Sequence, residues 1–294
     1  MKTYQLLTTT PRHSTFSNPQ RLQCRRTFMM TTRLSKEPRR FAPLGAGIDK
    51  GTEGLPRLKG IVFDVDGTLC LPQNYMFQLM RQALGIDKSV DILDHCHSLS
   101  PDEEAAALEK IRAIEREAMV SQQPQPGIVP LMEYLDSRKI PRGICTRNFD
   151  APVNHLLTKF LPSFEFSPVV TRDFKPPKPS PAGILHIAKS WGFTKEENGE
   201  EVGDAGNFIM VGDSIDDMTA GFRAGAATVL LANEVNVHLA QHEHTDLVIS
   251  RLVELVSILE EGFVGQIGKG DEESDTKARA AGALRDGKGE SSAV

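Results

Sequence analysis

The sequence has no long apolar run, and this absence excludes one large class of proteins. No stretch of the 294 residues approaches the roughly 18 uninterrupted apolar residues that a membrane-spanning helix needs, so we expect no membrane partner. The four cysteines, Cys24, Cys70, Cys96 and Cys145, show neither paired spacing nor a metal-ligand grouping. Such cysteine usage indicates a reduced intracellular compartment. The chain length suits one large domain or a domain that carries an insertion.

Acidic residues are almost missing from the N-terminal segment. Residues 1–47 contain nine lysines and arginines but one acid, Glu37, and therefore carry +8. Because the whole chain carries −5, the remaining residues carry −13, and this acidity argues against nucleic-acid binding as the main function. The segment is also rich in serine and threonine and has no periodic apolar face, a composition typical of an organelle transit peptide. We therefore expect a mitochondrial protein.

Two further features bear on this location. Arg26-Thr27-Phe28 resembles a mitochondrial processing site, because an arginine stands just before the expected cut. Met29 or Met30 offers a later start that omits most of the signal and gives a cytoplasmic product. The remaining alternative is a disordered basic tail that carries no targeting signal.

Two other segments read as disordered. Residues 268–294 are charged, rich in glycine, serine and alanine, and nearly free of large apolar residues, so we expect a disordered tail. Residues 194–206, TKEENGEEVGDAG, are acidic and contain glycine, and we expect a disordered surface loop there.

From about residue 55 short apolar runs alternate with helical patterns. The expected strands are 60–64, 142–146, 166–170, 208–211, 228–231 and 247–249, and the expected helices are 128–138, 151–160, 181–191, 217–224 and 251–260. The runs lack clean alternation, which is typical of parallel strands buried on both faces. The order predicts an α/β fold, a doubly wound, mostly parallel, Rossmann-like sheet. Ligands of such sheets bind outside the C-terminal ends of the strands.

Almost eighty residues separate the first expected strand from the second, far more than one crossover needs. Residues 75–84 and 89–98 read as short helices, and a serine-proline start followed by acids predicts a third helix over 100–121. Residues 122–127, QQPQPG, end the excursion as a linker. We expect a small all-helical insertion over the strand edge, which reads as a cap or lid. The predicted domains are a targeting or disordered basic segment at 1–54, an α/β core at 55–72 and 124–267, a helical cap at 73–123 and the tail at 268–294.

Polar side chains gather where the expected strands end. Asp64 and Asp66 follow the first strand and face the same way if it continues, so their charges repel and need a positive partner. The second strand ends at Thr146-Arg147-Asn148, and a proline-rich stretch with Lys178 follows the third.

The fourth strand ends in GDSIDD, with carboxylates at Asp213, Asp216 and Asp217. Together with the acids of the first strand these form a cluster suited to a hard divalent cation, most simply Mg²⁺. The threonine and lysine of the neighbouring strand ends add donors for a phosphate group.

Four motifs in this order resemble those of the haloacid dehalogenase-like hydrolase superfamily: DxDGT, a threonine at the end of the next strand, Lys-Pro-x-Pro and GDSxxDD. The likeness spans residues 55 to about 260. The helical insertion after the first motif resembles the cap of the phosphoglycolate phosphatase and phosphoglucomutase branch, although it is shorter.

This resemblance implies catalytic roles. Asp64 would be the nucleophile that attacks phosphorus, and a carboxylate needs no activating base at neutral pH. Asp66 would be the general acid that protonates the leaving oxygen and then the base that activates water. Dehalogenases of the superfamily lack this second acid, so Asp66 favours phosphoryl transfer over carbon–halogen cleavage.

The resemblance also implies metal ligands. The side chains of Asp64 and Asp213, with the backbone carbonyl of Asp66, would hold Mg²⁺. Asp217 would act through metal-bound water, while its neighbour Asp216 would face away.

Phosphate contacts are implied for Thr146 and Lys178, and the Pro-x-Pro after Lys178 favours it over Lys175. Arg147 either contacts an anionic substrate or is a surface arginine.

The leading interpretation is therefore a Mg²⁺-dependent phosphatase, expected to be a monomer, that hydrolyses a small phosphorylated metabolite and binds no nucleic acid. The alternatives are a phosphomutase on the same scaffold, which needs a bisphosphate intermediate, and a catalytically idle binding protein.

Overall fold

The computed structural model describes residues 39–45, 54–73 and 75–265, all within one compact unit of the chain. The processing site, the alternative starts and the predicted tail lie outside these residues. No helix of the described residues is long and apolar enough to cross a membrane.

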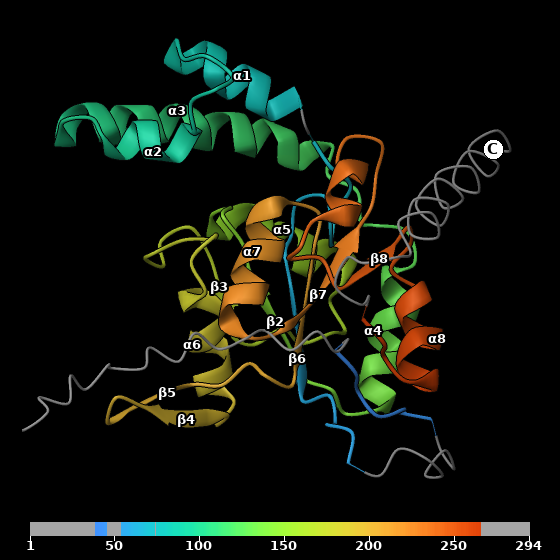
Figure 1. Cartoon of the computed structure of the whole chain (residues 1–294). Helices are drawn as coiled ribbons and strands as arrows, with labels where there is room; N and C mark the ends of the chain where they lie inside the picture. Colours follow the sequence, from blue (N-terminus) through green and yellow to red (C-terminus); the bar gives the residue numbers. More distant parts are fainter. Residues whose placement is uncertain (1–38, 46–53, 74, 266–294) are drawn as a thin grey trace, which may run out of the picture. The chain divides into compact units, whose positions relative to one another are not determined.

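A six-stranded parallel sheet forms the centre of the fold (Figure 1). Its spatial order is β3 (Val169–Val170), β2 (Arg142–Cys145), β1 (Gly60–Phe63), β6 (Phe208–Gly212), β7 (Ala227–Leu231) and β8 (Leu247–Ile249). Numbered by their order along the chain within this sheet, the strands run 3-2-1-4-5-6, the doubly wound arrangement. The predicted α/β fold class is therefore confirmed.

Helices cover both faces of the sheet. One core contains residues of α4 (Ile128–Ser137), α5 (Asp150–Phe160) and α8 (Glu254–Glu261), and the other contains residues of α6 (Ala182–Ser190) and α7 (Ile215–Ala224). Along β1, Ile61 and Phe63 enter the first core and Val62 enters the second. A strand with apolar partners on both faces has no reason to alternate, which explains the unbroken apolar runs.

The insertion between β1 and α4 is helical, as predicted. It contains α1 (Tyr75–Leu84), α2 (Ile92–His97) and α3 (Pro101–Val120), which share a small core of their own. Helix α2 is shorter than expected because the side chain of Asp91 accepts hydrogen bonds from the backbone N–H groups of Leu93 and Asp94 and so fixes its start.

The two ends of the insertion lie side by side. Leu71 N donates to Gln123 O at 2.9 Å, and Gln125 N donates to Leu69 O at 3.0 Å. The chain therefore leaves the core and re-enters it at one place.

The predicted loop at 194–206 is wrong. Residues there form an antiparallel hairpin of β4 (Thr194–Glu197) and β5 (Glu200–Gly203), visible at the bottom of Figure 1. Asn198 and Gly199 both have positive φ, 53° and 84°, as a two-residue hairpin turn of the primed type requires.

The boundary of the basic N-terminal segment also needs correction. The basic segment predicted at 1–54 includes residues 39–45, but Phe41 is only 2% exposed and packs on Phe263. The backbone N–H groups of Phe41 and Leu44 donate to carbonyls of Phe263 and Leu259. The part of the chain that packs on the core therefore begins by residue 39. A 3₁₀ helix at Val237–Gln241 completes the described elements.

Candidate active site

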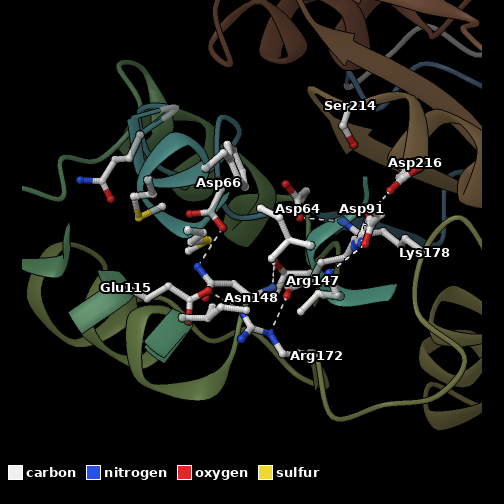
Figure 2. Close-up of a pocket in the computed structure, with 18 of the residues that line it drawn as sticks. Asp64, Asp66, Asp91, Glu115, Arg147, Asn148, Arg172, Lys178, Ser214 and Asp216 are labelled. Carbon is white, nitrogen blue, oxygen red and sulfur yellow. Dashed lines mark hydrogen bonds and ion pairs between the residues drawn. The ribbon is translucent and has the colours of Figure 1, made fainter. Parts of the chain in front are cut away.

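The site lies where β1, β2 and β6 end, at the reversal of strand order. Strand β1 pairs with β2 on one side and with β6 on the other. Asp64, Thr146 and Asp213 follow these three strands and line one cavity (Figure 2 shows part of its lining). The fold thus gathers polar groups that are distant in the sequence.

A tight turn after β1 presents Asp64 and Asp66. The backbone N–H groups of Thr68, Leu69 and Cys70 all donate to Val65 O, at 3.2, 2.9 and 3.0 Å. Gly67 has a φ of +79°, and a Cβ atom there would lie 2.1 Å from Asp213 Oδ2. Glycine is therefore needed at this position for two reasons, the backbone angle and the close approach of Asp213.

Lys178 supplies the positive charge that the adjacent carboxylates require. Its Nζ donates to Asp64 Oδ1 at 2.6 Å and also to Asp217 Oδ1, and the side chain is buried. Burial opposes the charged amine, yet the charges of Asp217 and Asp64 raise the pKa of Lys178 above its ordinary value. The lysine thus stays protonated. Lys175, by contrast, is exposed and contacts His97 Nε2 at 2.9 Å.

Three carboxylates meet closely enough to hold a cation. Oxygen atoms of Asp64, Asp213 and Asp217 lie within 4.8 Å of one another. Burial, then the charge of Asp217, raises the pKa of Asp64 to about 7, against the attraction of Lys178. Burial and the charges of Asp217 and Asp64 raise the pKa of Asp213 to about 8. A largely buried set of hard oxygen ligands, with Asp213 half-buried, whose mutual repulsion is incompletely balanced fits a small divalent cation such as Mg²⁺.

Asp66 turns its carboxylate away from this cluster. Asn148 Nδ2 donates to Asp66 Oδ2 at 2.8 Å. Burial raises the pKa of Asp66, while the hydrogen bond from Asn148 and the charges of Lys178 and Arg172 oppose that shift. A carboxyl group that retains its proton more readily than in water suits proton donation.

Helix α7 begins at the site, and the two acids in its first turn, Asp216 and Asp217, have different hydrogen-bond partners. Asp217 Oδ2 accepts hydrogen bonds from Ser214 N and Oγ at 3.0 and 2.6 Å, which closes a capping box. Asp216, the next residue along the helix, instead accepts from Arg147 Nη1 at 2.5 Å.

Arg147 joins the core to the insertion. Besides Asp216, its guanidinium contacts both oxygens of Asp91, at 2.9 and 2.8 Å. Arg147 therefore lines the cavity with its charge paired by two carboxylates, a state that neither predicted role described. Thr146 is buried at the cavity, and its Oγ1 accepts from Asn148 N at 3.1 Å.

Sequence reasoning missed a second pair of charges at this cavity. Arg172 follows β3 and forms a buried ion pair with Glu115 of α3. The signal was present in α3, where Glu115 occupies the buried stripe that Ala107, Ile111 and Ala118 mark at helical spacing. A charged residue in such a stripe indicates a buried partner.

The cavity is small and two-sided. Its volume is about 330 Å³, at the lower end of the range for small-molecule sites. The sheet edge contributes charged groups, whereas the insertion contributes apolar side chains, chiefly Met76, Phe77, Met80 and Leu93. This arrangement accommodates a small ligand with an anionic end and a larger part that meets apolar walls.

Comparisons with known proteins agree with this picture. A family model described as haloacid dehalogenase-like hydrolase matches residues 58–225. An uncharacterized hydrolase of Saccharomyces cerevisiae is 45% identical over 215 residues, which cover 72% of this chain and 94% of the relative. A haloacid dehalogenase-like hydrolase domain-containing protein of Arabidopsis thaliana is 38% identical over 191 residues, covering 61% of this chain and 73% of the relative.

Solved structures show the same fold. The crystal structure of a hydrolase from Pseudomonas syringae aligns with a TM-score of 0.57 at 21% identity, over 69% of this chain and 98% of that chain. At this identity the likeness concerns the fold alone.

Proposed function

The chain belongs to the haloacid dehalogenase-like hydrolase family, and on this premise we propose that it is a Mg²⁺-dependent phosphatase that hydrolyses a small phosphorylated metabolite through an aspartyl-phosphate intermediate. The observation that carries the proposal is the second carboxyl group, Asp66, held by Asn148 beside the buried Asp64. A nucleophile alone serves several displacements, but an alkoxide oxygen is a poor leaving group that needs a positioned proton donor, whereas a halide leaves without one.

The proposed reaction has two steps. Asp64 attacks phosphorus, the bond from phosphorus to the ester oxygen breaks, and Asp66 gives its proton to that oxygen so that the alcohol leaves. Asp66, now a carboxylate, takes a proton from water, which attacks the phosphorus of the aspartyl-phosphate. The bond from phosphorus to Asp64 breaks, and inorganic phosphate leaves.

The surrounding residues hold charge in place during both steps. Lys178 balances the charge of Asp64 and of the phosphoryl group, and Thr146 donates to a phosphoryl oxygen. Asp64, Asp213 and the carbonyl of Asp66, together with Asp217, would hold Mg²⁺. When bound, Mg²⁺ neutralises charge on the carboxylates and on the phosphoryl oxygens. The helical insertion acts as a cap that excludes water from the site.

A phosphate-release assay with the purified full chain and a panel of phosphate monoesters tests this proposal. We expect release with Mg²⁺, loss of release on adding EDTA, and poor support by Ca²⁺, which prefers more ligands and looser geometry. Asp64→Asn keeps the shape of the side chain but removes the nucleophile, and we expect it to lower release at least about a thousandfold.

Three outcomes would contradict the proposal. Full activity in metal-free buffer rules out the cation, and wild-type release by Asp64→Asn rules out the nucleophile. Release that occurs only when an activating bisphosphate is added favours the phosphomutase alternative.

A further inference from the structure

Among the three carboxylates that meet in the candidate site, Asp213 has the weakest side-chain support. Asp64 accepts a hydrogen bond from Lys178, and Asp217 accepts from Lys178 and Ser214. The Asp213 side chain is half-buried and has neither a hydrogen bond nor an ion pair among the described residues. The position of this carboxylate therefore depends on the backbone that carries it.

The side chain of Asn236 holds this backbone in place. Asn236 lies between β7 and the 3₁₀ helix and is 6% exposed. Its Nδ2 donates to Asp213 O at 2.7 Å and to Leu231 O at 3.0 Å. Its Oδ1 accepts from Asn233 N at 2.7 Å. Because only the amide nitrogen can donate to two carbonyl groups, these three partners also fix the orientation of the amide.

The amide of Asn236 acts where the pairing of two strands stops. Strands β6 and β7 pair up to Gly212 and Leu230, and Asp213 is the first residue beyond this pairing. The two hydrogen bonds from Asn236 tie Asp213 to Leu231, the last residue of β7. The carbonyl carbon of Asp213 is bonded to the Cα atom that bears the carboxylate, so a restraint on one restrains the other.

We propose that Asn236 is a positioning residue for the divalent cation, because it sets where the Asp213 carboxylate lies relative to the other two. Oxygen atoms of the three acids lie within 4.8 Å of one another, and Mg²⁺ tolerates little displacement of its ligands. Asn236 does not line the cavity, so it acts on the cation through Asp213. This inference rests on the proposed function, which supplies the cation, and adds a residue outside the four motifs.

The first test removes both donors. Asn236→Leu keeps a side chain of similar size but cannot hydrogen-bond to Asp213 or Leu231. Binding of Mn²⁺ to the purified full chain is measured by electron paramagnetic resonance, and binding of Mg²⁺ by its displacement of Mn²⁺. We expect both dissociation constants to rise roughly 10-fold or more, the usual effect of losing a group that orients a metal ligand. The increase in thermal midpoint that Mg²⁺ gives the wild-type protein should shrink in parallel.

Asn236→Asp gives a readout whose sign is informative. This change keeps the shape of the side chain, replaces the donor with an oxygen that is repelled by the two carbonyls, and adds a negative charge. Added negative charge by itself attracts a cation and lowers the dissociation constant, whereas a displaced Asp213 raises it. We expect the constant to rise, and a lower constant would overturn the inference. The same variant carries the test if Asn236→Leu does not fold, which its thermal midpoint without metal shows.

Two controls accompany these variants. Thr245→Val removes one buried hydrogen bond, from Thr245 Oγ1 to Leu239 O at 2.9 Å, in the same connection between β7 and β8. It should lower the thermal midpoint without metal but leave the dissociation constants unchanged, because that hydrogen bond does not involve Asp213. Asp213→Asn removes a negatively charged ligand, so it should weaken cation binding by at least as much as Asn236→Leu and thereby locate the measured ion.

The outcomes distinguish failure of this inference from failure of the proposed function. Equal cation binding by the wild type and the Asn236 variants, or an equal loss in Thr245→Val, would mean that Asn236 only stabilises its loop. Absence of cation binding by the wild type, or wild-type binding by Asp213→Asn, would refute the proposed cation site and this inference with it. The expected binding changes without any phosphate release would refute the phosphatase and leave the role of Asn236 intact.

Discussion

Asp66 and Asn148 give a pH dependence whose sign follows from their hydrogen bond. In the proposed reaction the first chemical step uses the protonated form of Asp66, so kcat/KM should fall as pH rises through the pKa of that carboxyl group. Burial raises that pKa, and the Asn148 hydrogen bond favours the carboxylate and opposes the shift. Asn148→Leu removes the hydrogen bond, so we expect the alkaline limb of the pH profile to move to higher pH.

The measurement is kcat/KM against pH for an ester with a poor leaving group. An ester with a good leaving group is the control, because it needs less protonation and should show a weaker alkaline limb. A limb that moves to lower pH in Asn148→Leu would contradict the acid role of Asp66.

Part of the site could be predicted from the sequence, because the C-terminal ends of the strands in a parallel sheet lie along one edge. That rule alone places Asp64, Thr146 and Asp213 together, and the structure has them on one cavity. The ion pairs were not accessible in this way. Arg147 and Asp91 are 56 residues apart and Arg172 and Glu115 are 57, so their pairing depends on how the insertion packs on the core.

At the scale of elements, the β4–β5 hairpin offers a test of packing. A Cβ atom on Gly203 would lie 1.9 Å from the backbone oxygen of Leu185 in α6, so Gly203→Ala must displace the hairpin from that helix. We expect this change to lower the free energy of unfolding by about 1–3 kcal/mol, the range for overpacking, and toward its upper end because the close contact is with backbone. Urea denaturation measures it, and phosphate release per folded molecule should persist because the hairpin contributes no residue to the cavity.

Gly199→Ala is the matched control in the same hairpin. A Cβ atom there would meet nothing within 4 Å. The substitution should therefore lower the free energy of unfolding only through the strain of a side chain at a φ of +84°, by about 1 kcal/mol. An equal loss in the two variants would show that contact with α6 does not matter.

This hairpin also shows why one element was predicted wrongly. Most side chains of β4 and β5 are charged and exposed, so the segment has neither an apolar face nor low charge. Composition therefore indicated disorder, while the Asn198-Gly199 pair, which favours a primed turn, was the informative signal.

The helical insertion gives a prediction about specificity. Replacing residues 75–121 with a short linker removes Asp91 and Glu115 but leaves Asp64, Lys178 and Asp213 on the sheet. We expect small generic esters to be hydrolysed still, more slowly, while preference among substrates is lost. Ratios of kcat/KM across an ester panel, compared with the full chain, provide the measurement. Unchanged preference would place specificity in the core loops, with Arg147 the first residue to examine.

At the scale of the whole molecule, the basic N-terminal segment predicts a mitochondrial location. The packed chain begins by residue 39, so we expect residues 1–38 fused to a reporter to direct it to mitochondria. Microscopy with a mitochondrial marker measures this. The control is the same fusion with Arg21, Arg25, Arg26 and Arg33 changed to glutamine, which should stay in the cytosol. If the unmodified fusion also stayed in the cytosol, the prediction would be wrong.

The two ends of the insertion lie side by side, joined by the Leu71–Gln123 and Leu69–Gln125 hydrogen bonds. This arrangement has a consequence for the evolution of the protein. A segment whose ends meet can be exchanged between related genes without altering the order of strands around it. The sheet that carries the candidate site and the helices of the insertion are therefore free to have separate evolutionary histories. A chimera that carries the matching segment of a relative between these two hydrogen-bonded crossings should inherit its chemistry from one parent and its substrate from the other.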